Sequence, residues 1–293
     1  MSNLKLTLAV EGRSGWIPMN YEVVRFPSGE ITVRFQQLHD VPVNDISNAT
    51  RYTISAIGVT TPEDVFIVQA AREWLVSQFP CNNIELACPF LPSSRQDRVA
   101  VDGDVCMLRV YFDILSRGFS RVFSMDVHSL ASEILVDRNM TVASYLGIRM
   151  SDPAVQGLMQ GVAMGITTLV APDNGALKRV EQVAKRFGGK SVAYGIKHRN
   201  PVDGSITSYD IVGDVSGKPC LIIDDICDGG RTFTECATKL REAGATFVTL
   251  YVSHGLFTKG VEALLDNGID AIYTTASTGF VVPEEYQDRV FVI

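Results

Sequence analysis

Lys218-Pro-Cys-Leu-Ile-Ile-Asp-Asp-Ile-Cys-Asp-Gly-Gly-Arg-Thr-Phe233 is the part of the sequence with the strongest structural signal. Its apolar run Cys220–Ile223 predicts a buried strand, followed by two adjacent acids, a turn with two glycines and a helical segment that ends near Gly244. Backbone N–H groups at such a turn and helix N-terminus can bind a phosphate, and carboxylates just before the turn can hold sugar hydroxyls. We therefore predict a ribose-phosphate site here, in preference to a plain turn whose acids only contribute solubility.

Length and composition indicate a globular protein with two domains. The chain has 293 residues, of which 46% are apolar and 20% charged. Its net charge of −7 argues against nucleic acid as the main partner, because proteins that bind a phosphate backbone usually present a basic face. The six cysteines show no C-x-x-C spacing, which favours reduced thiols and a cytoplasmic protein. No apolar run reaches transmembrane length, and the run Leu4–Val10 is too short for a signal peptide, so we expect no membrane association.

The first half of the chain alternates strands with helices. Helical spacing covers Pro62–Phe79 and Val105–Leu115, whereas Pro27-Ser-Gly-Glu30 predicts a tight turn and Pro89–Arg98 a polar loop. The strands predicted around them are Leu4–Val10, Glu22–Phe26, Ile31–Phe35, Arg51–Ile57, Ile84–Cys88 and Arg121–Met125. Strands that alternate with helices are typical of a mainly parallel sheet.

The same alternation repeats in the second half. Helices are predicted from Asp173 to Phe187, at Thr232–Ala243 and at Lys259–Asn267. The predicted strands are Thr167–Ala171, Ser191–Gly195, Ile206–Val212, Cys220–Ile223, Phe247–Val252, Ala271–Thr275 and Arg289–Ile293. We therefore predict an α/β fold with two similar domains, 1–147 and 148–293, each with a mainly parallel sheet flanked by helices.

Several segments together resemble the ribose-phosphate pyrophosphokinase (PRPP synthetase) family in order and spacing. Besides the stretch quoted first, they are Phe26-Pro-Ser-Gly-Glu30, Arg95-Gln-Asp-Arg98, Asp126-Val-His128, Pro172-Asp-Asn-Gly-Ala-Leu-Lys-Arg179 and Lys197-His-Arg199. The resemblance implies two domains of the type I phosphoribosyltransferase fold, with ATP on the N-terminal side and ribose phosphate on the C-terminal side. The central loop is most similar to a short branch of the family carried by phages and some bacteria, so a phage-encoded chain would work in the host cytoplasm.

The resemblance implies an ATP site in the N-terminal domain. In the family the hairpin that matches Phe26, Ser28 and Glu30 reaches the adenine of ATP across a subunit boundary, which implies a homo-oligomer. The family usually has Asp where this chain has Ser28. Arg95 and Gln96 match the ATP-binding loop, where a guanidinium can pair with the triphosphate or stack on the base; a solvated charged loop is the alternative interpretation.

The resemblance also implies a Mg²⁺-bound nucleotide. His128 matches the family's histidine associated with ATP and Mg²⁺, and Asp173 matches its second metal segment. From the residues alone, a lone His at a strand end is more often structural, and an Asp at a helix start can be a helix cap.

Lys197 and Arg199 match the family's flexible catalytic loop, and we expect them in a polar loop between two strands. Two cations there would neutralise the charge of an in-line phosphoryl transition state. A charged hairpin tip without catalytic function is the alternative.

In the C-terminal domain, the resemblance implies that Asp224 and Asp225 hold ribose hydroxyls. The 5-phosphate is then expected in the loop Asp228, Gly229, Gly230, Arg231 and Thr232. The family typically has Asp-Thr-Ala-Gly-Thr here. Two glycines remove side-chain bulk and Arg231 adds a cation, so the loop could accept the diphosphate of ADP-ribose in place of a monophosphate. Ribose 5-phosphate and ADP-ribose both remain open as acceptors.

The predicted function is a Mg²⁺-dependent transfer of the β,γ-diphosphate of ATP to the 1-hydroxyl of a 5-phosphorylated ribose, with release of AMP. The product would be PRPP from ribose 5-phosphate, or ADP-ribose 1-pyrophosphate in nucleotide and NAD synthesis. The alternatives are a phosphoribosyltransferase that consumes PRPP and a catalytically silent regulatory paralogue of the synthetase.

Overall fold

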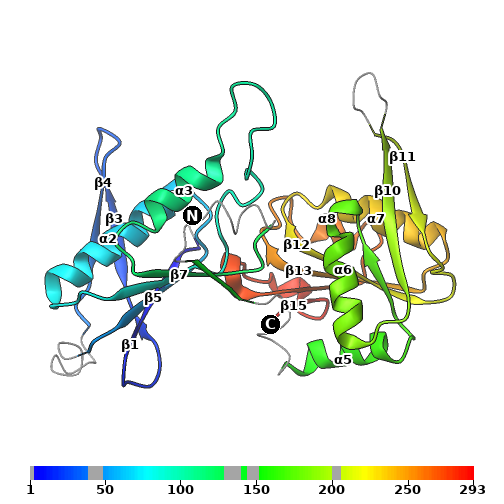
Figure 1. Ribbon diagram of the computed structural model, residues 1–293, viewed down its shortest axis with the longest axis horizontal. Coiled ribbons are helices and arrows are strands. Elements are labelled where there is room, and N and C mark those ends of the chain that lie inside the picture. Colours follow the sequence, from blue (N-terminus) through cyan, green and yellow to red (C-terminus); the bar gives the residue numbers. More distant parts are fainter. Residues whose placement is uncertain (1–2, 39–48, 129–139, 144–151, 200–205) are drawn as a thin grey trace. The chain divides into compact units, whose positions relative to one another are not determined.

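The computed structural model of the chain describes residues 3–38, 49–128, 140–143, 152–199 and 206–293. It divides into two compact units (Figure 1). Unit 1 comprises Met1–Ser144 with Ser277–Phe280, and unit 2 comprises Tyr145–Ala276 with Val281–Ile293. The predicted domain boundary near residue 147 lies outside the described residues.

Unit 1 contains a six-stranded sheet in the order β2-β1-β5-β6-β7-β8. Its strands are β1 (Lys5–Val10), β2 (Ile17–Pro18), β5 (Tyr52–Ile57), β6 (Ile84–Ala87), β7 (Arg121–Met125) and β8 (Met140–Ala143). The pairs from β5 to β8 are parallel, whereas β1 runs antiparallel to both β2 and β5.

A separate antiparallel hairpin of unit 1 joins β3 (Tyr21–Arg25) to β4 (Ile31–Phe35). The Phe26 N–H donates to the Glu30 carbonyl at 2.9 Å, and Gly29 supplies the positive φ of 89° that the turn requires. The predicted tight turn is therefore confirmed.

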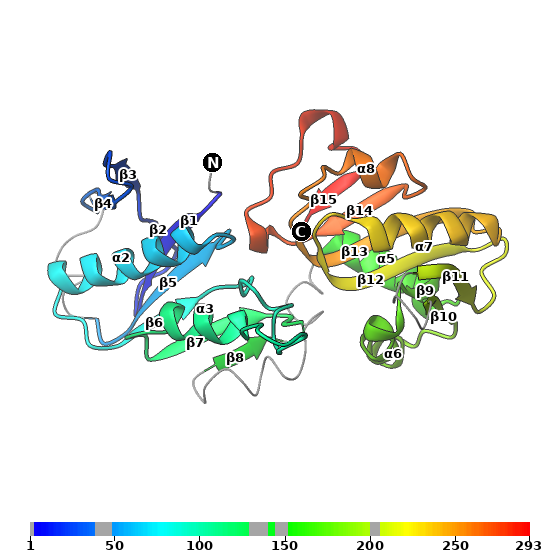
Figure 2. The same cartoon turned by 90° about the horizontal axis from the view of Figure 1, so that it is seen from above.

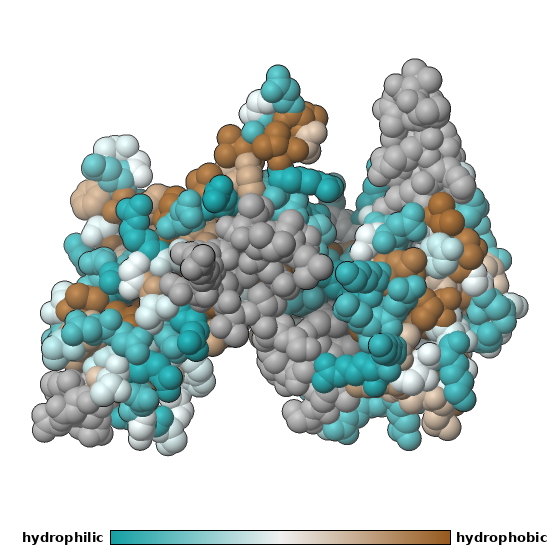
Figure 3. Space-filling model, viewed as in Figure 1, coloured by the Kyte–Doolittle hydropathy of each residue, from teal (hydrophilic) through white to brown (hydrophobic). Residues whose placement is uncertain are grey.

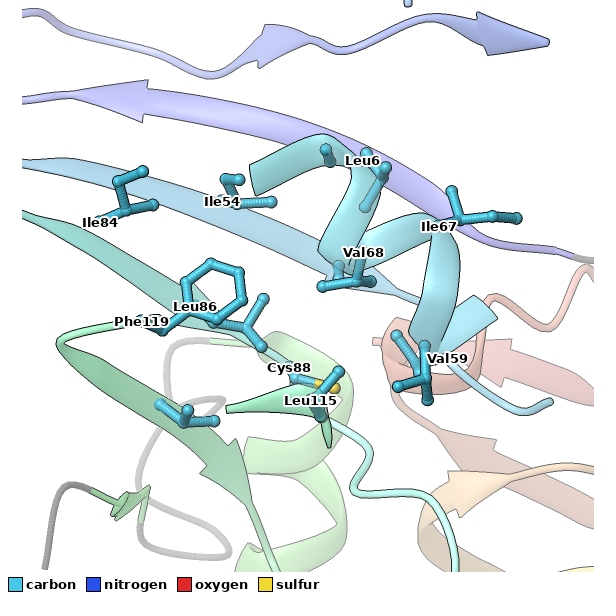
Figure 4. Packing of buried hydrophobic residues seen from close by; sticks show 14 of the residues in the cluster. Leu6, Ile54, Val59, Ile67, Val68, Ile84, Leu86, Cys88, Leu115 and Phe119 are labelled. Atoms are coloured by element: carbon cyan, nitrogen blue, oxygen red, sulfur yellow. The ribbon is translucent and has the colours of Figure 1, made fainter. Parts of the chain in front are cut away.

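Helices α2 (Pro62–Gln78) and α3 (Met107–Leu115) contact each other and cover the sheet of unit 1. A capping box between Thr61 and Asp64 starts α2. Figure 4 shows Ile67 and Val68 of α2 packed over the sheet, where Leu6 and Ile54 are buried, so apolar burial holds these layers together.

Unit 2 contains a seven-stranded sheet in the order β11-β10-β9-β12-β13-β14-β15. Its strands are β9 (Thr168–Ala171), β10 (Val192–Arg199), β11 (Ile206–Val212), β12 (Pro219–Cys227), β13 (Phe247–Gly255), β14 (Ala271–Thr274) and β15 (Val290–Val292). The β10–β11 pair is antiparallel and the other neighbouring pairs are parallel. The predicted α/β fold with mostly parallel strands is therefore confirmed.

Helices cover both faces of this second sheet. Figure 2 shows α7 (Arg231–Glu242) on one face and α6 (Asn174–Phe187) on the other. α5 (Pro153–Ala163) packs beside α6 in a core that includes Leu221 and Ile223 of β12. The remaining helical pieces are α8 (Glu262–Leu265) and two 3₁₀ turns, η1 (Ala276–Thr278) and η2 (Glu284–Tyr286).

The largest departures from the predicted boundaries are in β10, β12 and α8. β10 and β12 extend four residues further than predicted, to Arg199 and Cys227, because β11 and β13 supply hydrogen-bonding partners along these segments. α8 has only four residues where nine were predicted, since Gly260, with a φ of 78°, keeps the preceding residues out of the helix. The strands β2 and β8 and the helix α5 were not predicted.

None of the six cysteines, all of which lie in the described residues, forms a disulfide, and five of them are buried. Burial raises the pKa of Cys88 to about 12 and of Cys220 to about 11, so these thiols stay protonated and serve as core residues. Within the described ranges, no helix has both the length and the apolar character needed to cross a membrane.

Candidate functional site

The turn between β12 and α7 presents backbone N–H groups at the carboxyl end of β12. β12 ends at Cys227, and α7 begins at Arg231 with Gly230 as its N-cap. Gly230 has a φ of 79°, and a Cβ atom there would lie 2.8 Å from Leu264 Cδ2. Only glycine fits this position without strain, and the twelve-residue α7 that follows directs its N-terminal dipole toward the turn. This geometry suits a phosphate group.

The acid pair Asp224 and Asp225 lies inside β12, two residues before its end, and Arg179 of α6 binds both carboxylates. Arg179 Nη1 donates to Asp224 Oδ1 at 3.1 Å and to Asp225 Oδ1 at 3.2 Å. The Arg179 and Asp224 side chains are each 17% exposed and that of Asp225 only 3%. The pair is thus held in a fixed orientation by one cation.

The acid pair carries more charge than Arg179 compensates. Burial, followed by the neighbouring Asp225 carboxylate, raises the pKa of Asp224 well above its usual value, although Arg179 acts in the opposite direction. Perturbed carboxyl groups of this kind are typical of functional sites. Oriented carboxylates next to a phosphate-sized turn can accept hydrogen bonds from sugar hydroxyls.

A second loop lies against the phosphate turn. The hydroxyl of Thr258 donates to Asp228 Oδ1 at 2.7 Å, and the Thr258 N–H donates to the Asp228 carbonyl at 3.1 Å. The N–H groups of Leu256 and Phe257 donate to the Cys227 carbonyl. The loop after β13 therefore fixes the position of Asp228 at the start of the turn.

Arg231, which was predicted to add a cation to the turn, pairs with a carboxylate of its own helix. Its Nε donates to Glu235 Oε1 at 2.7 Å, one helical turn further along α7, and its side chain is 84% exposed. The i,i+4 ion pair draws the guanidinium along the helix surface. That Arg231 supplies the cation of the phosphate cradle stays a prediction.

Asp173 is the N-cap of α6. Its Oδ1 accepts hydrogen bonds from the N–H groups of Gly175 at 3.0 Å and Ala176 at 3.3 Å. The buried Tyr209 of β11 donates its hydroxyl to the carbonyl of Pro172, the residue before Asp173, at 2.6 Å. The tyrosine therefore links β11 to the loop that carries Asp173.

Lys197 and Arg199 lie in strand β10, where the sequence had predicted a loop. Lys197 is in register with Tyr209 of β11, and the register shifts between His198 and Arg199. Such a shift marks a β-bulge, which changes the direction of the strand at this point. The predicted catalytic pair therefore belongs to the last three residues of β10.

The predicted ATP-binding residues all belong to unit 1. Phe26 is 48% exposed, and Ser28 Oγ donates to Glu30 Oε2 at 2.9 Å within the hairpin turn. Arg95, Gln96 and His128 are exposed. The predicted metal residues are divided, with His128 in unit 1 and Asp173 in unit 2.

Sequence reasoning missed three residues of this site: Arg179, Tyr209 and Thr258. Arg179 was part of a quoted segment, but nothing in the sequence shows that it turns toward β12. In the part of the chain that the structure describes, no group of three or more His, Cys, Asp or Glu residues is arranged to hold a metal ion.

Comparison with known proteins identifies the family. Residues 151–289 match the phosphoribosyl transferase domain family. The chain is 30% identical over 253 residues to a ribose-phosphate pyrophosphokinase of Bifidobacterium longum, covering 80% of this chain and 71% of the relative. It is 26% identical over 260 residues to a ribose-phosphate pyrophosphokinase of Pyrococcus furiosus, covering 87% and 85%.

Among solved structures, phosphoribosylpyrophosphate synthetase from Mycobacterium smegmatis has the same fold. The TM-score is 0.70 at 23% identity, and the match covers 94% of this chain and 86% of the other. Taken with the 30% identity to the Bifidobacterium longum protein, this means that the chain belongs to the ribose-phosphate pyrophosphokinase family and is an enzyme of the diphosphokinase type.

Proposed function

We propose that this enzyme transfers the β,γ-diphosphate of ATP to the 1-hydroxyl of a 5-phosphorylated ribose and releases AMP. The observation that carries the proposal is the acid pair Asp224 and Asp225, which precedes a phosphate-sized turn by two residues in the same strand. The names of the relatives support ATP and ribose 5-phosphate as substrates.

In the proposed reaction the acceptor 1-hydroxyl oxygen attacks the β-phosphorus of ATP. The bond from the β-phosphorus to the oxygen that bridges it to the α-phosphorus breaks, AMP leaves with the electron pair, and the hydroxyl proton passes to water. Asp224 and Asp225 orient the ribose, and the turn from Asp228 to Thr232 binds its phosphate. Lys197 and Arg199 neutralise negative charge in the transition state.

The residues also fit a nucleotide-bound Mg²⁺. Mg²⁺ keeps several waters and usually binds one or two carboxylates together with substrate phosphates, so it needs no closed protein cage. Asp173 of unit 2 would hold the ion, which when bound neutralises charge on the nucleotide. On the ATP side we propose Phe26, Arg95 and Gln96 as contacts.

The acceptor is either ribose 5-phosphate or ADP-ribose. Gly229 leaves the outer side of the turn open, because a Cβ atom there would meet only the Lys259 side chain, at 3.5 Å or more. Because the Lys259 side chain is flexible, we propose that a second phosphate can be accommodated on this side of the turn. Ribose 5-phosphate is the acceptor that the names of the relatives favour.

A single assay tests the function: AMP release from ATP with Mg²⁺, with ribose 5-phosphate and ADP-ribose offered in turn. We expect turnover with at least one acceptor, and comparison of kcat/KM assigns the substrate. A phosphoribosyltransferase would release no AMP but would consume PRPP with a base, and a silent regulatory paralogue would do neither. Either result would overturn the proposal.

The roles of Lys197 and Arg199 have their own test. Replacing either with Ala should lower kcat by about 100-fold or more, as for other groups that stabilise transition-state charge. The melting temperature should stay nearly constant. Lys185, in the last turn of α6, provides a matched control, and its Ala variant should keep normal turnover. Normal kcat in both Lys197→Ala and Arg199→Ala would remove the pair from the mechanism.

A further inference from the structure

The two arginines assigned to the site both pair with carboxylates in the structure. Asp228 places a carboxylate at the start of the turn, and a sugar phosphate brings further negative charge. Arg179 is bound to the acid pair, and Arg231 is bound to Glu235. The N-terminus of α7 offers roughly half a positive charge. A second positive group beside the turn would therefore strengthen phosphate binding.

Lys259 lies beside the turn. A Cβ atom at Gly229 would lie 3.5 Å from Lys259 Cγ and 4.0 Å from Lys259 Cε, and it would meet no other atom within 4 Å. The lysine stem thus passes over the outer side of Gly229. The ammonium group is one bond beyond Cε, within reach of a phosphate bound to the N–H groups of the turn.

The loop that carries Lys259 is held rigidly against the turn. The two hydrogen bonds between Thr258 and Asp228 fix the preceding residue, and the Gly260 N–H donates to the Phe257 carbonyl at 2.9 Å on the other side. Phe257 itself has a φ of 45°, an unusual conformation for a residue with a side chain. Lys259 is exposed, and within the described residues its ammonium group has no ion-pair partner. The cation is therefore positioned and available.

We infer that Lys259 binds the phosphate of the acceptor and determines the affinity of the enzyme for phosphorylated sugars. The inference rests on the proposed function and deepens it, since it assigns to Lys259 the role that the sequence had suggested for Arg231. The ligand class is a phosphate ester of ribose, either a terminal monophosphate or the near phosphate of a diphosphate.

The test compares Lys259→Met with Lys239→Met, a matched control on α7 whose ammonium group pairs with Glu242 at 2.6 Å. Lys259→Met should raise the KM of the acceptor about tenfold, equivalent to about 1.4 kcal/mol, and leave kcat at saturation and the KM of ATP within about twofold. Lys259→Arg should restore most of the affinity. The melting temperature should not change in any of the three variants.

An acceptor KM in Lys259→Met within about twofold of the parent enzyme would overturn the inference, as would an equal rise in Lys239→Met. An equal rise in the KM of ATP would do so as well, because it would assign Lys259 to the nucleotide. Larger effects with ADP-ribose than with ribose 5-phosphate would extend the contact to the diphosphate.

Failure of the proposed function is distinguishable from failure of this inference. If the parent enzyme releases no AMP with either acceptor, the function fails, and titration calorimetry with ribose 5-phosphate and with inorganic phosphate still tests Lys259. Weaker binding of both ligands by Lys259→Met supports the phosphate contact. Unchanged binding, or no binding by the parent enzyme, overturns it.

Discussion

Gly230 determines the shape of the turn that precedes α7. Its φ of 79° is strained for a residue with a Cβ atom, and that atom would overlap Leu264 Cδ2 at 2.8 Å. Gly230→Ala should therefore lower the free energy of unfolding by about 1–3 kcal/mol. Chemical denaturation of both proteins measures the difference.

Gly229 provides the matched control. An alanine there would meet only the flexible stem of Lys259 at 3.5 Å, so Gly229→Ala should change stability by less than about 0.5 kcal/mol. Equal effects of the two substitutions would contradict this explanation of the turn. Exchanging Gly229-Gly-Arg231 for the family's Thr-Ala-Gly would place an alanine at position 230 and strain the backbone there. Gly229→Thr avoids this strain and is therefore the better substitution for testing whether the turn selects ribose 5-phosphate or ADP-ribose.

The raised pKa of Asp224 predicts how the free energy of unfolding depends on pH. Its pKa is raised in the folded protein by burial and by Asp225, so the folded state holds this proton more tightly than the unfolded state does. The stabilisation from the protonated group is complete below the ordinary Asp pKa and is lost as the pH rises through the raised value. Asp224→Asn, which cannot ionise, should therefore gain stability relative to the parent enzyme as the pH rises from 4 to 7.

The measurement is a series of denaturation curves across that pH range. A stability difference that does not change with pH would contradict the prediction. Activity should change in the opposite direction, because an amide replaces a carboxylate that accepts hydrogen bonds from ribose. The loss of one charged hydrogen bond, about 1.5–3 kcal/mol, corresponds to a rise in acceptor KM of about 10-fold to 100-fold.

At the scale of elements, Tyr209 joins three parts of the site. Its hydroxyl donates to Pro172 in the loop before α6, and it fills the space over Gly195 of β10, where any Cβ atom would overlap the phenol. Burial raises the pKa of Tyr209, so the phenol remains a donor throughout the working pH range. Tyr209 of β11 therefore binds the loop that carries Asp173 by one hydrogen bond and packs against β10, the strand that contains Lys197.

Tyr209→Phe removes that bond and keeps the ring. It should cost about 1 kcal/mol of stability and lower kcat about tenfold, while the KM of the acceptor changes little. Tyr273→Phe, on β14 of the same sheet, is the control, since its ring stacks on Phe291 and the change leaves that contact in place. If Tyr209→Phe and Tyr273→Phe lose stability and kcat to the same extent, the hydrogen bond of Tyr209 stabilises the fold and has no specific role in catalysis.

The elements themselves were largely predictable, and the errors have a physical cause. Apolar runs located the strands and gave Arg121–Met125 and Ile206–Val212 without error. The ends of β10 and β12 were missed because Lys197 and Asp224 are polar, yet each pairs with a neighbouring strand that local sequence does not reveal. Arg179 was missed for the same reason, since its contact crosses 45 residues of chain.

At the scale of the molecule, unit 1 exposes apolar side chains that a single chain leaves uncovered. Phe66 is 59% exposed beside a groove of about 660 Å³ between β4 and α2, lined partly by Phe35 and Trp74. Figure 3 shows further hydrophobic atoms near the tip of the loop before α3, where Val99, Val101 and Val105 are each at least 59% exposed. Exposed apolar surface of this extent is typical of an interaction site.

We therefore expect a homo-oligomer in which the hairpin turn with Phe26 completes the ATP site of a neighbour. Light scattering should show more than one subunit at assay concentration, and an active monomer would contradict the prediction. A mixing experiment tests the shared site directly. Phe26→Ala and Lys197→Ala should each be inactive alone, but an equimolar mixture should regain about a quarter of the parent activity after subunit exchange, because closed assemblies then contain some sites with both residues intact.

The control mixture combines Lys197→Ala with Asp224→Asn. Both residues belong to unit 2, so every site formed from these subunits carries one of the two substitutions, and at low acceptor concentration the mixture should be no more active than the mean of the two variants assayed alone. Activity above that mean would indicate that Lys197 and Asp224 act in different subunits. The mixture with Phe26→Ala could also stay inactive although the subunits exchange. Phe26 would then act in the same subunit as Lys197 or lie outside the site. In either case the oligomer would serve a purpose other than completing the ATP site.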